Sequence, residues 1–414
     1  MLKTAPTFSG PHRPAGVRLV NAVGAALSRV GLRLPRLDLP SLLRASKVDG
    51  ARLDADDDAA FVERVVALLD DANGAAQLNA VGRWIMHARL ANRLANRLRV
   101  RQWLLDHPRT QDVPVEQPLF VVGQPRTGTT LLYLLLAQDP QARAPRLWEV
   151  NTPVPPPLPD AGRDDPRYVR CERELARLHK YLPELAVAHD FAANVPDECY
   201  PMLETAGFSP TFFLYLDVPA YWTRLKAASA AEAEAAYALF RRQIQILLVR
   251  AEGRRWVSKS PAHLWFLDAL ARTFPDTGII ATQREPVEAI PSLCSLTAIT
   301  RSASSDYVDP AYIGRVVLDW FAESQRRTRA ARAGIDPSRI ADVPYRRLID
   351  APIGVVGELY ERFRLPFTHL FERRMRDWLG ANPQHRKGVH RYTLEQFGLT
   401  AAAIEEAAAG YGAA

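Results

Sequence analysis

The hydrophobic pattern of the chain changes near residue 118. From there on, short apolar runs alternate with stretches in which apolar residues recur at helical spacing. Strands are predicted at 119–122, 256–259, 278–283 and 339–344. Short buried strands separated by helices are typical of a parallel sheet with helices on both faces. The sequence therefore predicts an α/β domain over residues 116–414.

The first 115 residues follow another pattern and are predicted to be a mostly helical region. Residues 1–16 are rich in proline and glycine, which predicts a flexible start. Residues 17–34 combine apolar residues at helical spacing with three arginines, which predicts a basic amphipathic helix. A helix of this kind packs against its own protein, against a partner or against a membrane surface. The pattern leaves these three alternatives open.

A longer helix is predicted over 76–105, where apolar residues recur from Leu78 to Leu98. Its repeated Asn-Arg-Leu steps, at 92–94 and 96–98, predict a face of arginines exposed to solvent. The helical region contains no catalytic or binding motif, so the chemistry is expected in the α/β domain.

The segment 150–250 separates the first two predicted strands and is expected to be a helical insertion. Ligands of open parallel sheets bind beyond the carboxyl ends of the strands, and an insertion there can fold over that edge. We therefore expect a ligand pocket in this segment. Its aromatic residues either line an apolar pocket or fill the insertion's own core: Phe191, Phe208, Phe212, Phe213, Tyr215, Tyr221 and Trp222.

A phosphate-binding loop is predicted directly after the first strand. The sequence Gly-Gln-Pro-Arg-Thr-Gly-Thr-Thr at 123–130 leads from an apolar strand into a leucine-rich helix. Backbone N–H groups and the positive end of the helix dipole would converge there on an anion. The loop keeps the glycine spacing of a P-loop, but Thr129 replaces its lysine and the cation is Arg126. The fold is thus P-loop-like, without the lysine that grips a nucleoside triphosphate.

Two further polar clusters follow predicted strands. Lys259 ends the second strand, where its charge can neutralise a leaving phosphate oxygen. Arg284 follows the third strand, and Ser292 lies in the next helix. An arginine fork with a hydroxyl is suited to bind a second phosphate.

Composition narrows the class of protein. The chain has 48% hydrophobic residues, a net charge of +7, and no apolar run long enough to cross a membrane. Arginine and lysine are not interleaved with aromatics in dense runs, which argues against a nucleic-acid partner. The three cysteines lack metal-ligand spacing, so no metal is expected. No signal pattern begins the chain, so a cytoplasmic location is expected.

Together, the loop at 123–130, Lys259-Ser260-Pro261 and Arg284 with Ser292 resemble the sulfotransferases that use 3′-phosphoadenosine 5′-phosphosulfate (PAPS). The Pro-Arg-Thr-Gly-Thr-Thr loop is similar to that of a bacterial branch of this family. The resemblance implies transfer of a sulfuryl group from PAPS to a hydroxyl or amine, without a metal.

The resemblance also implies donor contacts. The phosphosulfate would be held by the loop residues Arg126, Thr127, Gly128, Thr129 and Thr130. The 3′-phosphate would be held by Arg284 and Ser292, and the adenine would lie near Tyr345. In this family an Arg-Lys-Gly step also reaches the 3′-phosphate, and this chain has Arg386, Lys387 and Gly388.

The acceptor must lose a proton as it attacks, so a general base is expected near the sulfur. Glu149, which follows the helix after the phosphate loop, is the first candidate. His189 in the insertion is the second, and Lys259 would assist the leaving group. Glu149 could instead cap a helix or pair with a cation. Asp197 and Glu198 are adjacent, so at most one of them should point into the site.

Two other functions compete with sulfuryl transfer. A P-loop kinase would need Mg²⁺ and the missing lysine. An inactive nucleotide-binding protein would keep the cations but lack a base. The acceptor itself is expected to be a small molecule, with a lipid or phenol favoured if the aromatics of the insertion line the pocket. Its identity and the oligomeric state are not readable from the pattern.

Overall fold

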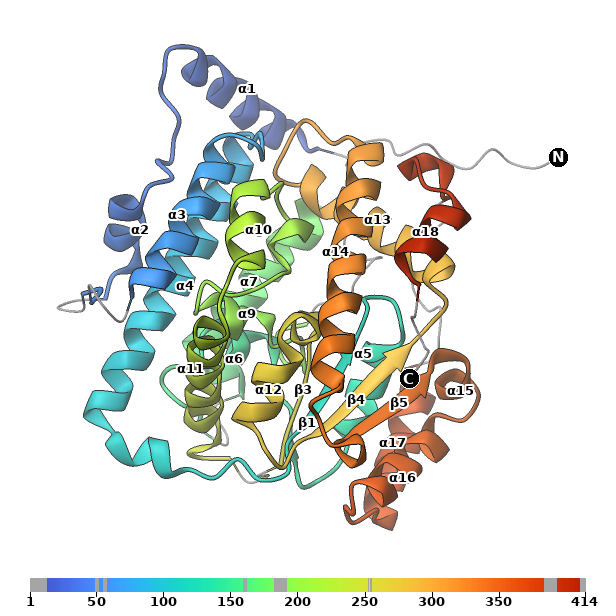
Figure 1. Ribbon diagram of the computed structural model, residues 1–414. Helices are drawn as coiled ribbons and strands as arrows, with labels where there is room; N and C mark the ends of the chain where they lie inside the picture. The colour runs from blue at the N-terminus through green and yellow to red at the C-terminus, as the bar shows by residue number, and fades with distance from the viewer. Residues whose placement is uncertain are drawn as a thin grey trace.

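The computed structural model describes residues 13–48, 52–54, 58–158, 162–181, 192–251, 253, 255–382 and 393–409. A parallel sheet lies at its centre, and helices pack around it (Figure 1). The strands are β1 (Leu119–Gly123), β2 (Ala142–Arg143), β3 (Arg255–Lys259), β4 (Gly278–Gln283) and β5 (Ile340–Pro344). Their order across the sheet is β2-β3-β1-β4-β5, and all neighbouring pairs are parallel.

The α/β prediction is confirmed, and four of the strands lie within one residue of their predicted bounds. The sequence did not predict β2. This edge strand has two residues, Ala142 and Arg143, which pair with Arg255 and Trp256 of β3. A strand that short has no alternation of apolar and polar residues to detect.

Both faces of the sheet are buried, because successive residues of a strand point to opposite sides. Leu119 and Val121 of β1 join one hydrophobic core, and Phe120 and Val122 join the other. The first core is closed by helices α5 (Thr129–Leu136), α15 (Tyr345–Asp350), α16 (Pro352–Arg362) and α17 (His369–Ala381). The second is closed by α11 (Ala230–Leu248), η4 (Pro261–Phe266), α12 (Leu267–Thr273), α13 (Pro286–Ser302), α14 (Pro310–Arg332) and α18 (Ala401–Ala407). Short 3₁₀ turns, η5 (Pro337–Arg339) and η6 (Glu395–Phe397), complete this part.

The N-terminal region is helical, as predicted. It comprises α1 (Ala15–Arg29), α2 (Leu39–Ser46), α3 (Ala59–Asn73), α4 (Ala80–Asp106) and η1 (Pro108–Asp112). Phe61 and Leu68 of α3 and Leu94 of α4 belong to the same hydrophobic core as Phe120 of β1. The N-terminal helices therefore share the core of the α/β region, and the predicted boundary at residue 115 stays a prediction.

The arginine face of α4 is not exposed to solvent, so this prediction was wrong. Arg89 and Arg93 form ion pairs with Glu204 of the insertion, at 2.5 and 2.8 Å. Arg97 and Arg101 pair with Asp58 at 2.5 and 2.7 Å. Arginine side chains can be buried when carboxylates neutralise them. The sequence pattern of α4 does not contain those partners, which come from other elements.

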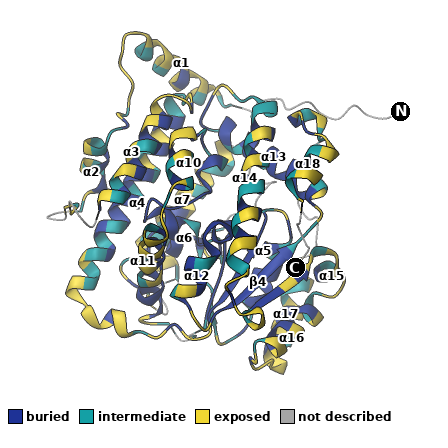
Figure 2. Ribbon diagram, in the orientation of Figure 1, coloured by how far each residue is buried: buried dark blue, intermediate teal, exposed yellow. Residues whose placement is uncertain are grey.

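The insertion is helical and lies beside α3 and α4 (Figure 1). Its elements are α6 (Leu147–Asn151), η2 (Gly162–Asp164), α7 (Pro166–Tyr181), α9 (Tyr200–Glu204), η3 (Phe212–Leu214) and α10 (Pro219–Lys226). Of its aromatic residues, Phe208, Phe212, Phe213 and Tyr221 are fully buried among other core side chains. Figure 2 shows the same burial around the sheet. These four residues therefore fill the core, and Phe191 lies outside the described residues.

Candidate active site

The strand register brings the predicted polar residues to one edge of the sheet. Lys259, the last residue of β3, pairs with Val121 of β1, and Gly123 at the end of β1 pairs with Thr282 of β4. Gln283 pairs in turn with Pro344 of β5. The phosphate loop, Lys259, Arg284 and Tyr345 thus follow the carboxyl ends of four adjacent strands. This is the edge at which open parallel sheets bind ligands.

The loop between β1 and α5 is held in shape by Thr127. Its hydroxyl donates to the carbonyl of Gln124 at 2.7 Å and contacts the hydroxyl of Thr282 at 2.6 Å. A side chain at Gly123 would place its Cβ 2.2 Å from the Thr282 hydroxyl, so only glycine fits there. Thr127 is fully buried, so it shapes the loop from within.

Backbone geometry at the end of the loop suits an anion. Gly128 has φ of 86°, and a Cβ there would lie 3.0 Å from the Tyr345 ring. Arg126 also adopts a left-handed conformation, with φ of 73°. Such a conformation is unfavourable for a non-glycine residue and is concentrated at functional sites. The amino end of α5 begins at Thr129 and carries unpaired N–H groups and a positive dipole.

Lys259 forms the centre of the site. Its side chain is only 2% exposed, and its Nζ donates to Glu198 Oε1 at 2.6 Å and to Thr130 Oγ1 at 3.3 Å. The ammonium thus connects the phosphate-loop helix to a carboxylate of the insertion. Within the pair the ammonium is buried, whereas the Glu198 side chain is 19% exposed.

A short strap of chain, residues 195–199, positions Glu198. The amide of Asp197 donates to the carbonyl of Pro145 at 3.1 Å, and the amide of Cys199 donates to the carbonyl of Lys259 at 3.0 Å. The Asp197 carboxylate accepts from the Glu198 amide at 2.6 Å. The strap is therefore fixed on both sides of Glu198, whose carboxylate turns towards Lys259. Sequence reasoning allowed one member of the Asp197–Glu198 pair into the site but did not identify which.

The residues predicted for the two ends of the donor lie in contact with each other. Arg126 Nε donates to Ser292 Oγ at 3.0 Å, and Arg284 Nη1 donates to the carbonyl of Arg126 at 3.1 Å. Arg284 also pairs with Glu288 at 2.9 Å, and its guanidinium lies 4.4 Å from the centre of the Tyr345 ring. The loop, α13 and α15 therefore converge on one cationic surface.

Both carboxylate oxygens of Glu149 are engaged in contacts within the protein. One carboxylate oxygen accepts from the Arg146 amide at 2.7 Å, in a capping box that begins α6, and the other pairs with Arg143 at 2.9 Å. Its side chain is 2% exposed. Glu149 as the general base stays a prediction. The other candidate base, His189, and the residues Arg386, Lys387 and Gly388 lie outside the described residues.

His263 is a packed residue of the core. Its Nδ1 contacts the hydroxyl of Tyr237 at 2.8 Å, and its Nε2 contacts Cys199 Sγ at 3.2 Å. Burial lowers the pKa of the His263 imidazole to about 3, so the ring is neutral at pH 7. The residue supports the strap from below through Cys199.

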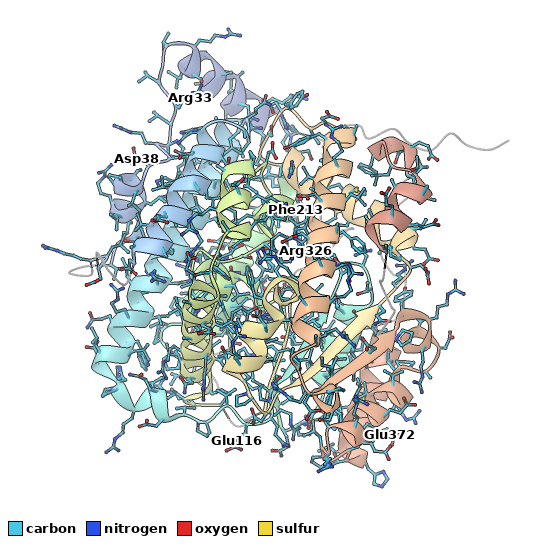
Figure 3. All side chains as sticks on the ribbon, viewed as in Figure 1. Arg33, Asp38, Glu116, Phe213, Arg326 and Glu372 are labelled. Atoms are coloured by element: carbon cyan, nitrogen blue, oxygen red, sulfur yellow. The ribbon has the colours of Figure 1, made fainter. Side chains whose placement is uncertain are left out.

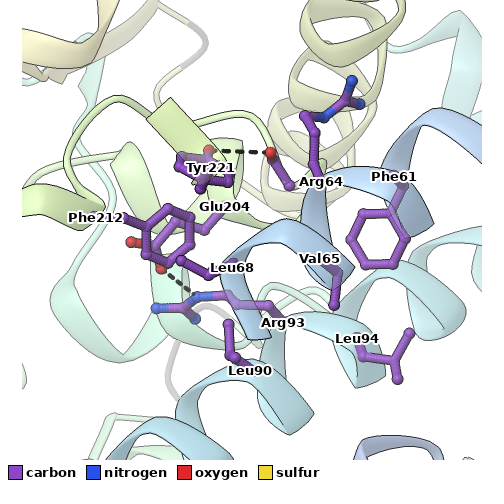
Figure 4. Close-up of a pocket in the computed structure, with 11 residues that line it drawn as sticks. Phe61, Arg64, Val65, Leu68, Leu90, Arg93, Leu94, Glu204, Phe212 and Tyr221 are labelled. Atoms are coloured by element: carbon purple, nitrogen blue, oxygen red, sulfur yellow. Dashed lines mark hydrogen bonds and ion pairs between the residues drawn. The ribbon is translucent and has the colours of Figure 1, made fainter. Parts of the chain in front are cut away.

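Two cavities lie near the insertion. The one in Figure 4 lies between α3, α4 and the insertion and has about 10 Å³, room for about one water molecule. Arg93 and Glu204 on its wall pair with each other, and a cavity of this volume is too small for a substrate. The second has about 380 Å³. Its lining includes Tyr215, Asp217, Arg301, Val308 and Tyr312.

The second cavity is linked to the strap. Tyr215, one of its lining residues, contacts the Tyr200 hydroxyl through its own hydroxyl at 2.7 Å, and Tyr200 directly follows the strap. The lining also includes a polar group, in which the Tyr312 hydroxyl donates to Asp217 at 2.9 Å and Arg301 lies 3.6 Å from the same carboxylate. The cavity therefore has both apolar and polar walls.

The described residues contain no cluster of three or more histidines, cysteines or carboxylates that could bind a metal ion. The carboxylate that a kinase would most plausibly use, Asp342, forms an ion pair with Arg332 at 2.6 Å.

Comparison with known proteins decides the family. The model of the family described as the sulfotransferase family matches residues 118–369, more than half of the chain. The chain belongs to the sulfotransferase family. The resemblance inferred from the sequence is therefore confirmed, while the assignment of the loop to a particular branch stays a prediction.

Relatives of this sulfotransferase come from mycobacteria. The chain is 24% identical over 299 residues to the omega-hydroxy-beta-dihydromenaquinone-9 sulfotransferase Stf3 of Mycobacterium bovis, covering 69% of this chain and 72% of the relative. It superposes on the sulfotransferase STF1 of Mycobacterium tuberculosis with a TM-score of 0.80 and 30% identity, covering 90% and 98% of the two chains. STF9 of Mycobacterium avium gives 0.80 and 29%, covering 90% and 95%.

Proposed function

We propose that this sulfotransferase transfers a sulfuryl group from PAPS to the hydroxyl of a lipid-like small molecule. The observation that carries the proposal is Lys259, which contacts the phosphate-loop helix through Thr130 and the partly exposed Glu198 on its other side. A cation between an anion cradle and a carboxylate is what sulfuryl transfer requires. The sulfuryl group must pass from an anionic donor to an acceptor that loses a proton.

The residues present fit PAPS. Glycine at 128 lets the Tyr345 ring pack directly against the loop, where a Cβ would lie 3.0 Å from the ring, and the amino end of α5 supplies N–H donors. Arg126, Arg284 and Ser292 would hold the phosphates, and Tyr345 would lie against the adenine. When bound, PAPS supplies the sulfuryl group. Lys259 places a positive charge where the leaving phosphate oxygen gains negative charge.

Glu198 is the general base that the geometry favours. Its carboxylate is partly exposed, faces Lys259 and is fixed by the strap. Both oxygens of Glu149 are already engaged, and its side chain is buried. Glu198 would accept the proton of the acceptor hydroxyl as its oxygen bonds to sulfur, while the bond from sulfur to the phosphate oxygen breaks.

The cavity of about 380 Å³ is the candidate acceptor site. Its lining residue Tyr215 contacts Tyr200, which directly follows the strap, and its lining is partly apolar. The curated relative is named for a hydroxylated menaquinone derivative, which supports a hydroxylated lipid as the class of acceptor.

The test has two parts. The purified protein is titrated with 3′,5′-adenosine bisphosphate without metal, and separately with ATP and Mg²⁺, while its melting temperature is followed. Labelled PAPS is then supplied with a panel of hydroxylated lipids and phenols. Stabilisation by the bisphosphate and labelled product support the proposal. Stabilisation only by ATP with Mg²⁺ would indicate a kinase, and donor binding without product on any acceptor would indicate an inactive nucleotide-binding protein.

A further inference from the structure

Helix α1 contacts the protein along one side only. The Asn21 side chain accepts a hydrogen bond from the Val81 amide at 3.1 Å, at the start of α4. Gly24 lies so close to Ala80 that a Cβ on it would come within 2.3 Å of the Ala80 Cβ. Val17 and Leu27 are partly buried on the same side of the helix. The inner face of α1 is therefore mixed, and two of its four positions are an asparagine and a glycine.

The apolar stripe of α1 is turned outwards. Leu19, Val23, Ala26 and Val30 recur at i, i+4, i+7 and i+11, which places them on one side of the helix. Leu19 is 66% exposed, Val23 is 51% exposed, and Val30 is 72% exposed. Figure 2 shows α1 as largely exposed at the edge of the molecule. The stripe continues into the next loop with Leu32 and Leu34, at 53% and 58%. We call these residues the α1 surface.

The charged side chains of the chain segment that contains α1 are all positive. The first 37 residues contain Lys3, Arg13, Arg18, Arg29, Arg33 and Arg36 but no aspartate or glutamate, and Asp38 is the first acidic residue. Arg18 and Arg29 are exposed beside the apolar stripe. Figure 3 shows Arg33 at the corner where α1 leads into α2. An exposed apolar face bordered by arginines is complementary to the headgroups and acyl chains of an anionic bilayer.

A further exposed apolar pair lies on the helix that supports α1. Trp84 and Ile85 of α4 are 69% and 44% exposed, one turn after the contact at Ala80. Tryptophan is enriched where proteins meet the interface of a bilayer. None of the helices in the described ranges is long and apolar enough to cross a membrane, so a contact here would be with the surface.

We propose that the α1 surface binds the surface of an anionic lipid bilayer, with the apolar stripe in the headgroup region and the arginines on the phosphates. Binding of the α1 surface to a bilayer does not depend on the proposed sulfuryl transfer. The benefit of such binding, delivery of a lipid acceptor, rests on the proposed function. Arg13, just before α1, donates to the carbonyls of Ser302 and Ser305 at 2.9 and 2.8 Å, and Ser305 lines the cavity proposed for the acceptor. The bilayer contact would thus bring the acceptor cavity to the source of a lipid.

The test compares binding of purified full-length variants to vesicles by sedimentation. Vesicles contain phosphatidylcholine alone or with phosphatidylglycerol. The double variant Leu19→Glu, Val23→Glu is expected to bind anionic vesicles at least about tenfold more weakly than the wild type, because two inserting side chains become charged. The matched control is Leu105→Glu on the last turn of α4, where an equally exposed leucine lies at the opposite end of that helix.

Charge is tested separately. Arg18→Ala and Arg29→Ala should each weaken binding to anionic vesicles by about fivefold, and raising salt should do the same. Binding to vesicles of phosphatidylcholine alone should be weak throughout. Melting temperatures of all variants should stay near that of the wild type, because the altered side chains are exposed.

Two outcomes would overturn the proposal. One is equal vesicle binding by the wild type and the Leu19→Glu, Val23→Glu variant. The other is a wild-type dimer in light scattering that this variant converts to a monomer, with no vesicle binding by either, which would make the α1 surface a contact between two copies of the chain. Sulfuryl transfer to an acceptor dispersed in detergent is measured in parallel. Activity without vesicle binding would contradict only the proposed membrane contact. Vesicle binding without activity would contradict only the proposed function.

Discussion

Arg126 donates through Nε to the hydroxyl of Ser292 at 3.0 Å. The resemblance to the family implies that these residues hold opposite ends of the donor, and in the structure they are in direct contact. Arg284 extends the contact by donating to the Arg126 carbonyl at 3.1 Å. The loop is thus attached to α13, and its cations are held near each other by contacts within the protein. A preorganised site of this kind loses less entropy when it binds an anion.

Removal of the Arg126 side chain should weaken donor binding. Arg126→Ala is expected to lower the affinity for 3′,5′-adenosine bisphosphate by about 1.5–3 kcal/mol, the usual scale for a hydrogen bond to a charged group. Titration calorimetry measures this directly. Arg36→Ala is the control, because its side chain is 75% exposed and lies outside the site. Equal affinities for the two variants would remove Arg126 from the donor site.

The contact between Arg126 and Ser292 should appear as coupling. In a double-mutant cycle with Arg126→Ala and Ser292→Ala, the two losses in bisphosphate affinity should differ from additivity by about 0.5–3 kcal/mol. Strict additivity would mean that the two residues act on the ligand independently.

The choice of general base can be tested with two isosteric variants. Glu198→Gln should reduce turnover by about 10²–10⁴-fold, while bisphosphate affinity changes little. Glu149→Gln should instead lower the melting temperature, because it leaves the largely buried Arg143 guanidinium without its counter-charge. The comparison needs single-turnover rates and melting curves. Glu149 would be the general base if the Glu149→Gln enzyme is folded but has no turnover while the Glu198→Gln enzyme stays active.

The acceptor cavity makes a prediction about KM. Val308→Trp places an indole in the lining of the cavity of about 380 Å³. The KM for a long acceptor should rise several-fold, whereas bisphosphate affinity should stay the same. Val249→Trp on the end of α11 serves as the control, because Val249 is exposed and is not part of the lining. An unchanged KM in Val308→Trp would place the acceptor elsewhere.

The ion pairs of α4 should dominate the stability of the N-terminal region. Burial would raise the pKa of the Glu204 carboxyl, but the charges and hydrogen bonds of Arg89 and Arg93 outweigh burial and lower the pKa. Glu204→Gln leaves two guanidiniums without their counter-charge and should cost about 3–5 kcal/mol in urea unfolding. Asp319→Asn, which breaks an exposed pair with Lys226, should cost no more than about 1 kcal/mol.

His263 should make stability depend on pH. Its pKa is lowered by burial from 6.5 to about 3, so below pH 6.5 the unfolded chain takes up a proton that the folded chain refuses. The contribution of this histidine is present above pH 6.5 and is lost as the pH falls towards 3. The free energy of unfolding should therefore decline less between pH 7.5 and pH 5 in His263→Gln than in the wild type. His369→Gln, at an exposed position, should keep the wild-type slope.

Four of the strands were predictable because each is a short, mostly buried segment set between helical patterns. Lys259 and Arg284 could be placed at one edge from that pattern alone, since parallel strands end on the same side. The environment of Arg93 could not be predicted, because its partner Glu204 is distant in sequence and the spacing of apolar residues does not indicate ion pairs. Glu198 was missed as the favoured base for the same reason. Its position depends on hydrogen bonds from the strap to Pro145 and Lys259, which local sequence patterns do not reveal.

The strap at 195–199 has an evolutionary consequence. The proposed donor site is formed by the loop after β1 and the ends of β3, β4 and β5, whereas Glu198, Tyr200 and Tyr215 come from the insertion. Two hydrogen bonds between backbone groups hold the strap in place, and they do not depend on the identity of side chains other than proline. Under the proposed function, the insertion can diverge in sequence to select new acceptors while the same nucleotide is used, so we expect exchange of this segment between relatives to alter acceptor specificity.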